Sequence, residues 1–206
     1  MKLRSVDMAD EFLNDISGVC NVDYAILKSL VLRELDASLS SIDPVAVEQM
    51  KNEILKAKHV FFVGVGRVLL TAQCVVKRLS HIGISAHYVG EITEPAIAPG
   101  DLLVVVSGSG STMFPLAIAQ KAKSLGARVV HVGSNPESPM KEYADFMLRI
   151  PVRTKQYLPD EIDSVQLMTS LFEQSVLLLG DILAMMIVYA KGIDIKALWM
   201  NHANLE

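Results

Sequence analysis

The stretch Leu102-Leu103-Val104-Val105-Val106-Ser107-Gly108-Ser109-Gly110-Ser111-Thr112 decides the fold class of this chain. Its first five residues form a continuous apolar run, which is typical of a strand that is covered on both faces. The next six residues are a turn rich in glycine and hydroxyl groups, and an amphipathic helix is expected directly after it, over 113–125. Strand, glycine turn and helix together indicate one unit of a parallel α/β sheet.

The same unit recurs on both sides of this stretch. Residues 60–63 form another apolar run, which ends at a glycine turn and leads into a helical stretch that reaches Ile82. Three further runs, 86–89, 128–132 and 146–150, complete five candidate strands. Short apolar runs that alternate with helices predict a parallel sheet with helices on both faces and right-handed crossovers.

The flanks of this α/β region read as helices. Apolar residues recur at helical spacing between about residues 8 and 58, and Asp43-Pro44 fits an N-cap followed by a proline in the first turn. Residues 166–191 would form one long helix, apolar on most of its circumference. We expect a single domain over 1–206, with N-terminal helices over 1–58, the sheet core over 59–151 and C-terminal helices over 164–206.

Composition narrows the function classes. The 206 residues are 51% hydrophobic and 20% charged, with a formal net charge of -4, which favours one folded domain over disorder. No basic cluster marks a face for nucleic acid. The most apolar stretch, 176–190, is interrupted by Gly180 and Asp181 and is too short to span a membrane. Cys20 and Cys74 lie far apart and the N-terminus does not resemble a signal peptide, so we expect a cytoplasmic protein.

The turn Ser107-Gly108-Ser109-Gly110-Ser111-Thr112 is the strongest candidate site. Ligands of doubly wound sheets lie beyond the carboxyl ends of the strands, where this turn lies. Its glycines allow a ligand to approach the backbone, and its hydroxyls and the start of the next helix offer donors that suit phosphate oxygens. A helix N-cap alone would need only one serine. No Gly-Lys-[Ser/Thr] follows, which excludes a Walker A loop.

A second turn, Gly64-Val65-Gly66-Arg67-Val68-Leu69, partly matches a dinucleotide-binding fingerprint, with Leu69 in place of the third glycine. Glu91 lies beyond the next strand, as a ribose-binding acid would. The alternative, which we favour over binding of NAD, is a tight strand-to-helix turn in which Arg67 is solvated or contacts the anion. The polar residues 88–95, among them Glu91, either line a pocket or cap their loop.

Glu173 and His202 are the candidates for proton transfer. Glu173 falls inside the apolar helix, where a carboxylate is costly to bury unless it is paired. It is either a general base or a surface glutamate at a gap in the packing. His202 lies in a polar chain end, which is either frayed or functional. We interpret three other histidines, His81, His87 and His131, as packing residues, and no pair of histidines has metal-ligand spacing.

Together these motifs resemble the sugar-isomerase (SIS) domain family, whose members bind phosphosugars, and within it the 6-phospho-3-hexuloisomerases. The likeness covers nearly the whole chain beyond about Ile54. It rests on the turn 107–112, on Phe172-Glu173-Gln174 and on the closing His202-Ala203-Asn204-Leu205, in that order. Further matching stretches are 61–67, 77–83, 89–97, 154–155 and 170–174.

The resemblance implies a five-stranded parallel sheet in a three-layer α/β/α sandwich, and a homotetramer built from dimers. Family members interconvert 3-hexulose 6-phosphate and fructose 6-phosphate through a cis-enediol, without metal or cofactor. Glu173 matches the position of the base that carries the proton. His202, reaching into the site of a neighbouring subunit, would assist proton transfer on the oxygens.

The resemblance also implies which residues meet the phosphosugar. Four hydroxyl groups would hold the phosphate, those of Ser107, Ser109, Ser111 and Thr112. We place five further residues in the same substrate site, namely Gly66, Arg67, Glu91, Gly108 and Gly110.

Three departures from the family's pattern surround this pocket. Val68 and Leu69 follow Arg67 where the family has a serine and a glycine, Asn201 replaces an arginine before His202, and Glu94 replaces a threonine. The phosphate contacts are retained, whereas the sugar contacts are altered. The function expected first is therefore a phosphosugar isomerase, and the alternative is a phosphosugar-binding sensor without activity. Leu69 argues against a third reading, an NAD-dependent enzyme.

Overall fold

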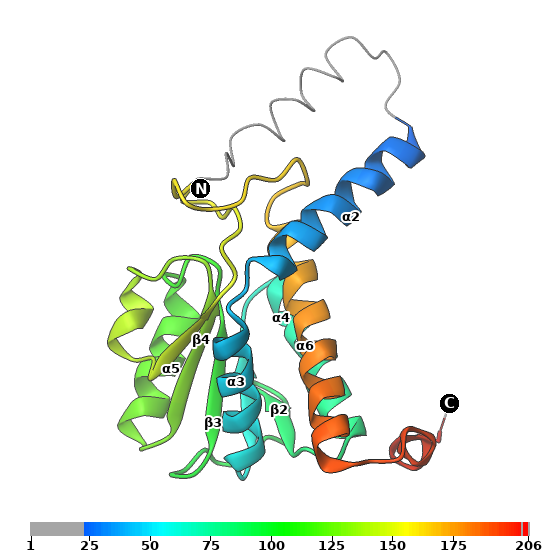
Figure 1. Cartoon of the computed structure of the whole chain (residues 1–206). Coiled ribbons are helices and arrows are strands. Elements are labelled where there is room, and N and C mark those ends of the chain that lie inside the picture. Colours follow the sequence, from blue (N-terminus) through cyan, green and yellow to red (C-terminus); the bar gives the residue numbers. More distant parts are fainter. Residues whose placement is uncertain (1–22, 203, 206) are drawn as a thin grey trace.

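Five parallel strands form one sheet in the order β2-β1-β3-β4-β5 (Figure 1). The computed structural model describes residues 23–202, 204 and 205. The strands are β1 Val60–Val63, β2 Ala86–Tyr88, β3 Leu102–Val106, β4 Arg128–Gly133 and β5 Phe146–Arg149. All five predicted strands are confirmed, each to within one residue at either end. In register, Val60 pairs with Leu102 and Leu102 with Arg128, so the three central strands start level.

Helices cover both faces of the sheet, and the predicted three-layer sandwich is confirmed (Figure 1). Helices α3 (Pro44–Lys56), α4 (Arg67–His81) and α6 (Ser170–Lys191) lie on one face, and α5 (Met113–Ser124) lies on the other. Helix α2 (Tyr24–Ser40) packs on α6. Two short 3-10 helices complete the described chain, η1 (Pro139–Glu142) after β4 and η2 (Ile195–Asn201) near the end.

Alternate residues of each strand enter two separate cores because side chains point to opposite faces along a strand. Val60, Phe62 and Val104 pack with α3, α4 and α6, whereas Phe61 and Leu103 pack toward α5. Every residue of β1 and β3 is buried. This double coverage explains why these strands are continuous apolar runs rather than alternating ones.

Two of the predicted N-terminal helices are present, and their junction has the expected form. The Asp43 side chain accepts a hydrogen bond from the Val45 N–H, and Pro44 is the first residue of α3. Such a cap satisfies a backbone donor that the helix itself leaves unpaired. The part of the prediction that covers residues 8–22, and Cys20 with it, lies outside the described residues.

Helix α6 begins four residues later than the sequence pattern suggests, at Ser170 rather than Gln166. Met168 has a φ of 57°, in the left-handed region that a right-handed helix cannot include. The side-chain amide of Gln166 is hydrogen-bonded to Glu34 of α2. Long-range contacts therefore replace the first turn that periodicity predicts.

Helix α6 is also longer than the apolar stretch that marked it. With 22 residues, the helix is long and apolar enough, by length and composition alone, to cross a membrane. However, 61% of its most apolar 18-residue window is buried against the rest of the chain. Its neighbours are α2, α3 and α4. The apolar character of α6 thus reflects its place in the core.

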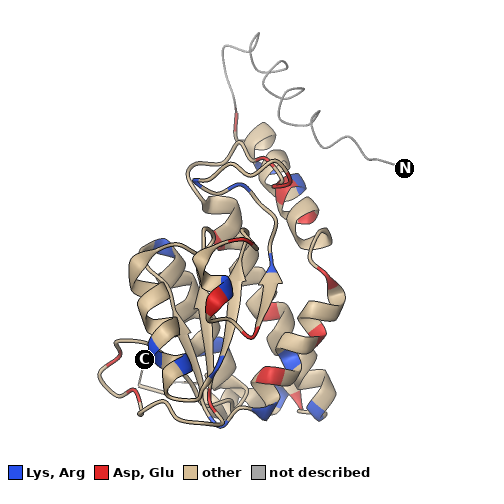
Figure 2. Ribbon diagram, turned by 90° about the vertical axis from the view of Figure 1, so that its left-hand side faces the viewer, with Lys and Arg blue, Asp and Glu red and all other residues tan. Residues whose placement is uncertain are grey.

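Charged residues of both signs are distributed over the whole ribbon. Figure 2 shows Lys and Arg interspersed with Asp and Glu on the helices and on the loops that face the viewer. Several of them form ion pairs, such as Arg128 with Glu53 at 2.7 Å and Arg149 with Asp160 at 2.7 Å. Mixed charge of this kind is typical of a solvated surface.

Candidate functional site

The turns that follow β1 and β3 meet at the point where the strand order reverses. Strands β1 and β3 are hydrogen-bonded neighbours, yet the chain leaves β1 toward α4 on one face and leaves β3 toward α5 on the other. A Cβ added at Gly64 would lie 3.4 Å from the carbonyl oxygen of Val106, so the two turns approach closely. Ligands of doubly wound sheets bind in the crevice at such a switch point.

The three helices that begin at this edge of the sheet lack side-chain caps. The N-cap residues of α4, α5 and α6 are Gly66, Thr112 and Thr169, and none makes a capping hydrogen bond. By contrast, α2 and α3 are each capped by an aspartate. A carboxylate cap would repel an anion, whereas uncapped N–H groups and the positive end of the helix dipole attract one. The edge is therefore suited to an anionic ligand.

Residues 107–112, which we call the serine loop, fold into a compact turn at the end of β3. Ser107 and Ser109 are buried, and the Ser109 hydroxyl accepts hydrogen bonds from the N–H and the hydroxyl of Ser111. Gly110 has a φ of 60° and donates its N–H to the carbonyl of Ser107. The loop holds several hydroxyl groups beside the start of α5, which is the donor set expected for phosphate. A single N-capping serine would not require this arrangement.

Buried side chains of β4 and of the turn after it pack against the serine loop. His131 is 1% exposed, and its Nε2 donates to the carbonyl of Ser107 at 2.8 Å. Burial lowers the pKa of His131, and the hydrogen bond to Ser107 opposes this only in part. Within the described residues, the buried hydroxyls of Ser134 and Ser138 have no hydrogen-bond partner. A buried hydroxyl costs free energy unless a polar group, such as a water molecule, pairs with it.

Glycine is required at position 110 for reasons of space as well as conformation. A Cβ added there would lie 2.1 Å from the Oγ of Ser138 and 2.9 Å from the Cε1 of His131. No side chain fits at those distances. The loop backbone thus lies directly against His131 of β4 and against Ser138, which follows β4 in sequence.

Glu173 in the first turn of α6 is a buried carboxylate with a partner on each oxygen. Its side chain is 8% exposed. Oε2 accepts a hydrogen bond from the Nε of Arg67 at 2.6 Å, and Oε1 accepts one from the Thr169 hydroxyl at 2.9 Å. Of the two alternatives for Glu173, a surface glutamate at a gap in the packing is wrong, because the carboxylate is buried and paired. Arg67, which is the first residue of α4, brings the two helix starts together.

The first turn of α6 also touches the serine loop. A Cβ at Gly108 would lie 3.1 Å from the Cγ2 of Thr154 and 3.7 Å from the Cδ1 of Phe172. Phe172 precedes Glu173, so the first turn of α6, which carries the carboxylate, lies beside the serine loop. The structure thus unites Gly66, Arg67, Glu173 and residues 107–112, which lie more than 100 positions apart at the extremes.

Glu91 has its own partners at the edge of the sheet. Its Oε1 is 2.6 Å from the Nδ1 of His87, and its Oε2 accepts the backbone N–H of Tyr88. No hydrogen bond or ion pair in the described part of the chain joins Glu91 to the serine loop or to Glu173. Its assignment to the substrate site remains a prediction.

His202 lies at the other end of α6 from Glu173. Its ring stacks on that of His81 with centroids 5.3 Å apart, and Trp199 lies beside it. A helix rises about 1.5 Å per residue, so Glu173 and the end of α6 are separated by about 27 Å. Figure 1 shows the C-terminal segment beyond the lower end of α6. Within one chain the structure does not bring these two residues together.

The three departures from the family's pattern have visible contacts. Val68 packs against the core beside Gly64, and the Asn201 side chain donates to the carbonyl of His81 at 2.9 Å. Glu94 accepts the N–H of Gly90 in its own loop. Each of these residues therefore contributes to local structure.

Sequence reasoning missed two parts of the site. His131 was interpreted as a packing residue, although it supports Ser107, because its contact depends on the pairing of β3 with β4. Thr169 was not singled out, although its spacing of four residues from Glu173 is one at which helical side chains meet. Among the described residues, no group of three or more His, Cys, Asp or Glu side chains is placed to hold a metal ion.

Comparison with known proteins identifies the family. The SIS domain profile matches residues 53–178. The chain is 39% identical to a 3-hexulose-6-phosphate isomerase of Bacillus subtilis (strain 168), over 85% of this chain and 95% of the relative. It is 36% identical to a 3-hexulose-6-phosphate isomerase of Mycobacterium gastri, over 86% and 89% respectively.

Solved structures agree with this likeness. The crystal structure of a hypothetical protein from Methanococcus jannaschii, which was taken to infer a molecular function of 3-hexulose-6-phosphate isomerase, superposes with a TM-score of 0.74. It is 28% identical, and the match covers 86% of this chain and 98% of that one. On its sequence, its sheet topology and the serine loop at its switch point, the chain belongs to the SIS domain family.

Proposed function

We propose that this protein is a 3-hexulose-6-phosphate isomerase, which converts 3-hexulose 6-phosphate into fructose 6-phosphate. The observation that supports the proposal is the contact of the first turn of α6 with the serine loop, in a turn where the buried Glu173 carboxylate accepts a hydrogen bond from Arg67 at 2.6 Å. Relatives of that name at 39% and 36% identity support the choice of substrate.

The reaction moves a carbonyl group from C3 to C2 of the sugar. Glu173 would remove the proton from C2 to form a cis-enediol between C2 and C3, and would return the proton to C3. The hydroxyl proton on O2 would pass to O3, so that no atom is gained or lost. One carboxylate can serve both carbons because they are adjacent and share one face of the enediol. This chemistry requires neither a metal nor a redox cofactor.

Substrate binding would divide between the serine loop and Arg67. The hydroxyls of Ser107, Ser109, Ser111 and Thr112, with the uncapped start of α5, would hold the phosphate. Arg67 is 71% exposed on its side chain although it is bonded to a buried carboxylate, so a ligand can reach it. It would stabilise negative charge on the enediol oxygen. Gly66, Gly108 and Gly110 would keep the backbone open to the ligand.

His202 would act in the site of a neighbouring copy, because its own Glu173 is too far away. An apolar stripe supports such an assembly: Leu178, Ile182, Met185 and Tyr189 recur every three to four residues along α6 and are 36% to 69% exposed. We infer a homotetramer built from dimers, in which this stripe is covered. The exposed free thiol of Cys74 fits a cytoplasmic location.

Deuterium incorporation tests the function directly. In the reverse direction, fructose 6-phosphate incubated with the protein in heavy water should gain deuterium at C3 and form a second ketose phosphate, both visible by proton NMR. An isomerase that interconverts an aldose and a ketose would instead label C1. Glu173→Gln should remove the exchange while it retains phosphosugar binding by calorimetry.

The outcomes separate the two functions. Deuterium at C3 that depends on Glu173 supports the isomerase. Binding of a phosphosugar without exchange in the wild-type protein would reject it in favour of a sensor. Undiminished exchange in Glu173→Gln would remove this carboxylate from the mechanism.

A further inference from the structure

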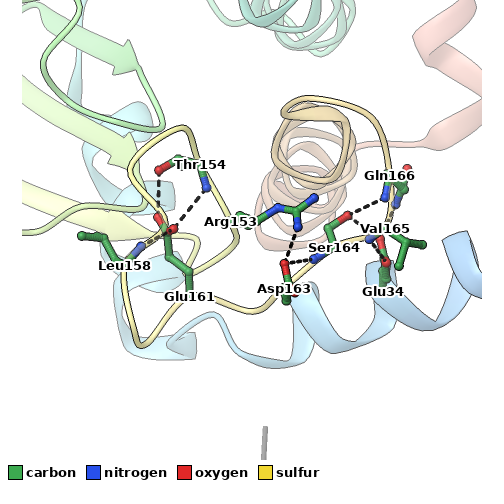
Figure 3. A network of polar contacts seen from close by, with 9 residues as sticks. All are labelled: Glu34, Arg153, Thr154, Leu158, Glu161, Asp163, Ser164, Val165 and Gln166. Carbon is green, nitrogen blue, oxygen red and sulfur yellow. Dashed lines mark hydrogen bonds and ion pairs between the residues drawn. The ribbon is translucent and has the colours of Figure 1, made fainter. Parts of the chain in front are cut away.

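The segment 151–169, which joins β5 to α6, lies along both parts of the proposed site. It contains one isolated β-bridge, between Val152 and Ile162, and its ordered shape depends on polar side-chain contacts (Figure 3). Two carboxylates, Glu161 and Glu34, accept three hydrogen bonds each, and they hold opposite ends of the segment.

The first carboxylate, Glu161, holds the end near the serine loop. Its Oε2 accepts the N–H groups of Thr154 and Leu158 at 3.1 and 2.9 Å, and its Oε1 accepts the Thr154 hydroxyl at 3.0 Å. Thr154 is 4% exposed, and its methyl group lies against Gly108. The hydrogen bonds to Glu161 therefore hold Thr154 in contact with the serine loop.

The second carboxylate, Glu34 of α2, holds the end near the base. It is 7% exposed and accepts three hydrogen bonds: from the Ser164 hydroxyl at 2.6 Å, the Val165 N–H at 2.7 Å and the Gln166 amide at 2.9 Å. These three residues lie shortly before α6, which begins at Ser170. Hydrogen bonds to a buried carboxylate are short and directional, so they fix the path of the chain toward Thr169.

We call Glu34 and Glu161, with the hydrogen bonds that they accept, the two clamps of the segment. The backbone between the Glu34 clamp and Glu173 is strained. Met168 has a φ of 57°, which is unfavourable for a side chain other than glycine, and it is 90% exposed, so no burial of its own side chain compensates. The next residue, Thr169, donates to Glu173. Without the Glu34 contacts, relaxation of Met168 would rotate Thr169 away from the carboxylate that it orients.

We propose that Glu34 and Glu161 are positioning residues with separate effects on the reaction: Glu34 orients the base through Thr169, and Glu161 shapes the phosphate site through Thr154. This inference rests on the proposed function. Neither carboxylate touches substrate. Their separation predicts that kcat and KM respond to different substitutions, because proton transfer depends on one end of the segment and phosphate binding on the other.

Steady-state kinetics on 3-hexulose 6-phosphate test the separation. Glu34→Gln replaces one acceptor oxygen by an amide that faces its former donors, and should lower kcat about 10- to 100-fold with KM changed less than about twofold. Glu161→Gln should raise KM about tenfold with little change in kcat. Calorimetry should show weaker phosphosugar binding for Glu161→Gln only. Glu137→Gln, on the exposed pair with Lys141, is the matched control and should change neither constant.

Two milder substitutions keep the test decisive if a clamp variant unfolds. Ser164→Ala removes one donor to Glu34, and Thr154→Val removes one donor to Glu161. Ser164→Ala should lower kcat as Glu34→Gln does, and Thr154→Val should raise KM as Glu161→Gln does, each by a smaller factor. Thr169→Val should lower kcat as Glu34→Gln does, and Thr169→Ser, which retains the hydroxyl, should restore it.

Equal changes in kcat and KM for both clamps, or changes in thermal stability alone, would overturn the inference. If Glu173→Gln lost turnover while the clamps showed no such split, the proposed function would stand and the inference alone would fail. Full turnover by Glu173→Gln would reject the proposed base whatever the clamp variants did.

Discussion

The Nε of Arg67 donates a hydrogen bond to Oε2 of Glu173 across 2.6 Å, and this contact ties the first residue of α4 to the first turn of α6. It joins an exposed cation to a buried carboxylate at the switch point of the sheet. The arginine side chain is 71% exposed, whereas the carboxylate is 8% exposed. In the proposed reaction, a phosphosugar would therefore meet the guanidinium before it meets the base.

Removal of this guanidinium should impair activity more than stability. For Arg67→Ala we expect kcat/KM to fall about 10- to 100-fold, the range for a hydrogen bond to a charged group. Unfolding free energy should fall by about 1 to 2 kcal/mol, because the arginine is exposed but its removal leaves the buried Glu173 carboxylate with the Thr169 hydroxyl as its remaining partner.

The matched control for that substitution is Arg128→Ala, at the opposite edge of the sheet. Arg128 is 50% exposed and pairs through its Nε with Glu53, which is 12% exposed, at 2.7 Å. Urea unfolding should give a similar loss for both variants, and kinetics should give a loss for Arg67→Ala alone. Equal effects on kcat/KM would show that the Arg67 contact is structural only.

The serine loop should be sensitive to one methyl group at Gly110. Gly110→Ala places a Cβ on the Ser138 hydroxyl and adds the cost of a left-handed φ, so we expect a loss of about 2 to 4 kcal/mol in stability. Phosphosugar affinity by calorimetry should fall at least about tenfold, because the loop must shift.

Gly66→Ala separates strain from steric overlap. Gly66 has a φ of 58°, close to that of Gly110, but an added Cβ would meet nothing within 4 Å. Its ψ of -137° makes this conformation one that side chains other than glycine rarely adopt, so the substitution should lower the unfolding free energy by about 1 to 3 kcal/mol through backbone strain alone. Equal losses at both positions would indicate that backbone conformation, not contact with Ser138, makes glycine necessary at 110.

His131 should make stability depend on pH in a defined direction. Burial lowers its pKa in the folded state below the ordinary 6.5, so as pH falls the unfolded chain takes up the proton first. The contribution of His131 to the unfolding free energy is present above pH 6.5, and it is lost as pH falls through the lowered pKa of the folded state. Urea unfolding between pH 7.5 and 5.5 should show this loss.

His131→Gln is the variant that tests this assignment. Glutamine can still donate to the Ser107 carbonyl but does not titrate, so its unfolding free energy should vary less over the same pH range. If the wild-type protein and the variant lost stability in parallel, another group would be responsible.

Subunit mixing should reveal whether the site is shared. Glu173→Gln and His202→Ala should each be nearly inactive alone. When the two are unfolded and refolded together, mixed assemblies would contain some sites with both native residues, and part of the activity should return. No recovery in assemblies shown to be mixed would place His202 outside the neighbour's site.

The exposed stripe of α6 should be needed for assembly. Ile182→Glu introduces a charge at the centre of the stripe and should shift the protein to a smaller species by light scattering, with loss of activity. Ile92→Glu, at an equally apolar but fully exposed loop residue, is the control and should leave assembly unchanged. An oligomer that persists in Ile182→Glu would exclude this stripe as the interface.

Much of the fold follows from local pattern. The apolar runs and glycine turns of residues 60–132 predict the strands and the order of helices, because burial on both faces demands continuous apolar strands. Asp43-Pro44 predicts the start of α3 because capping depends on neighbouring residues. The start of α6 could not be predicted in this way, since Glu34, more than 100 residues earlier, accepts hydrogen bonds from Val165 and Gln166 and holds this segment outside the helix.

The sequence by itself determined the class of sheet, and it predicts an anion site at the serine loop and a need for a partner at Glu173 if that carboxylate is buried. These depend on periodicity, turn chemistry and the cost of burying charge, which act over a few residues. Only the tertiary structure decided that Arg67 is the partner of Glu173, that His131 supports Ser107, and that His202 lies far from its own Glu173. Those relationships arise from strand order and helix packing, which join residues that no local pattern connects.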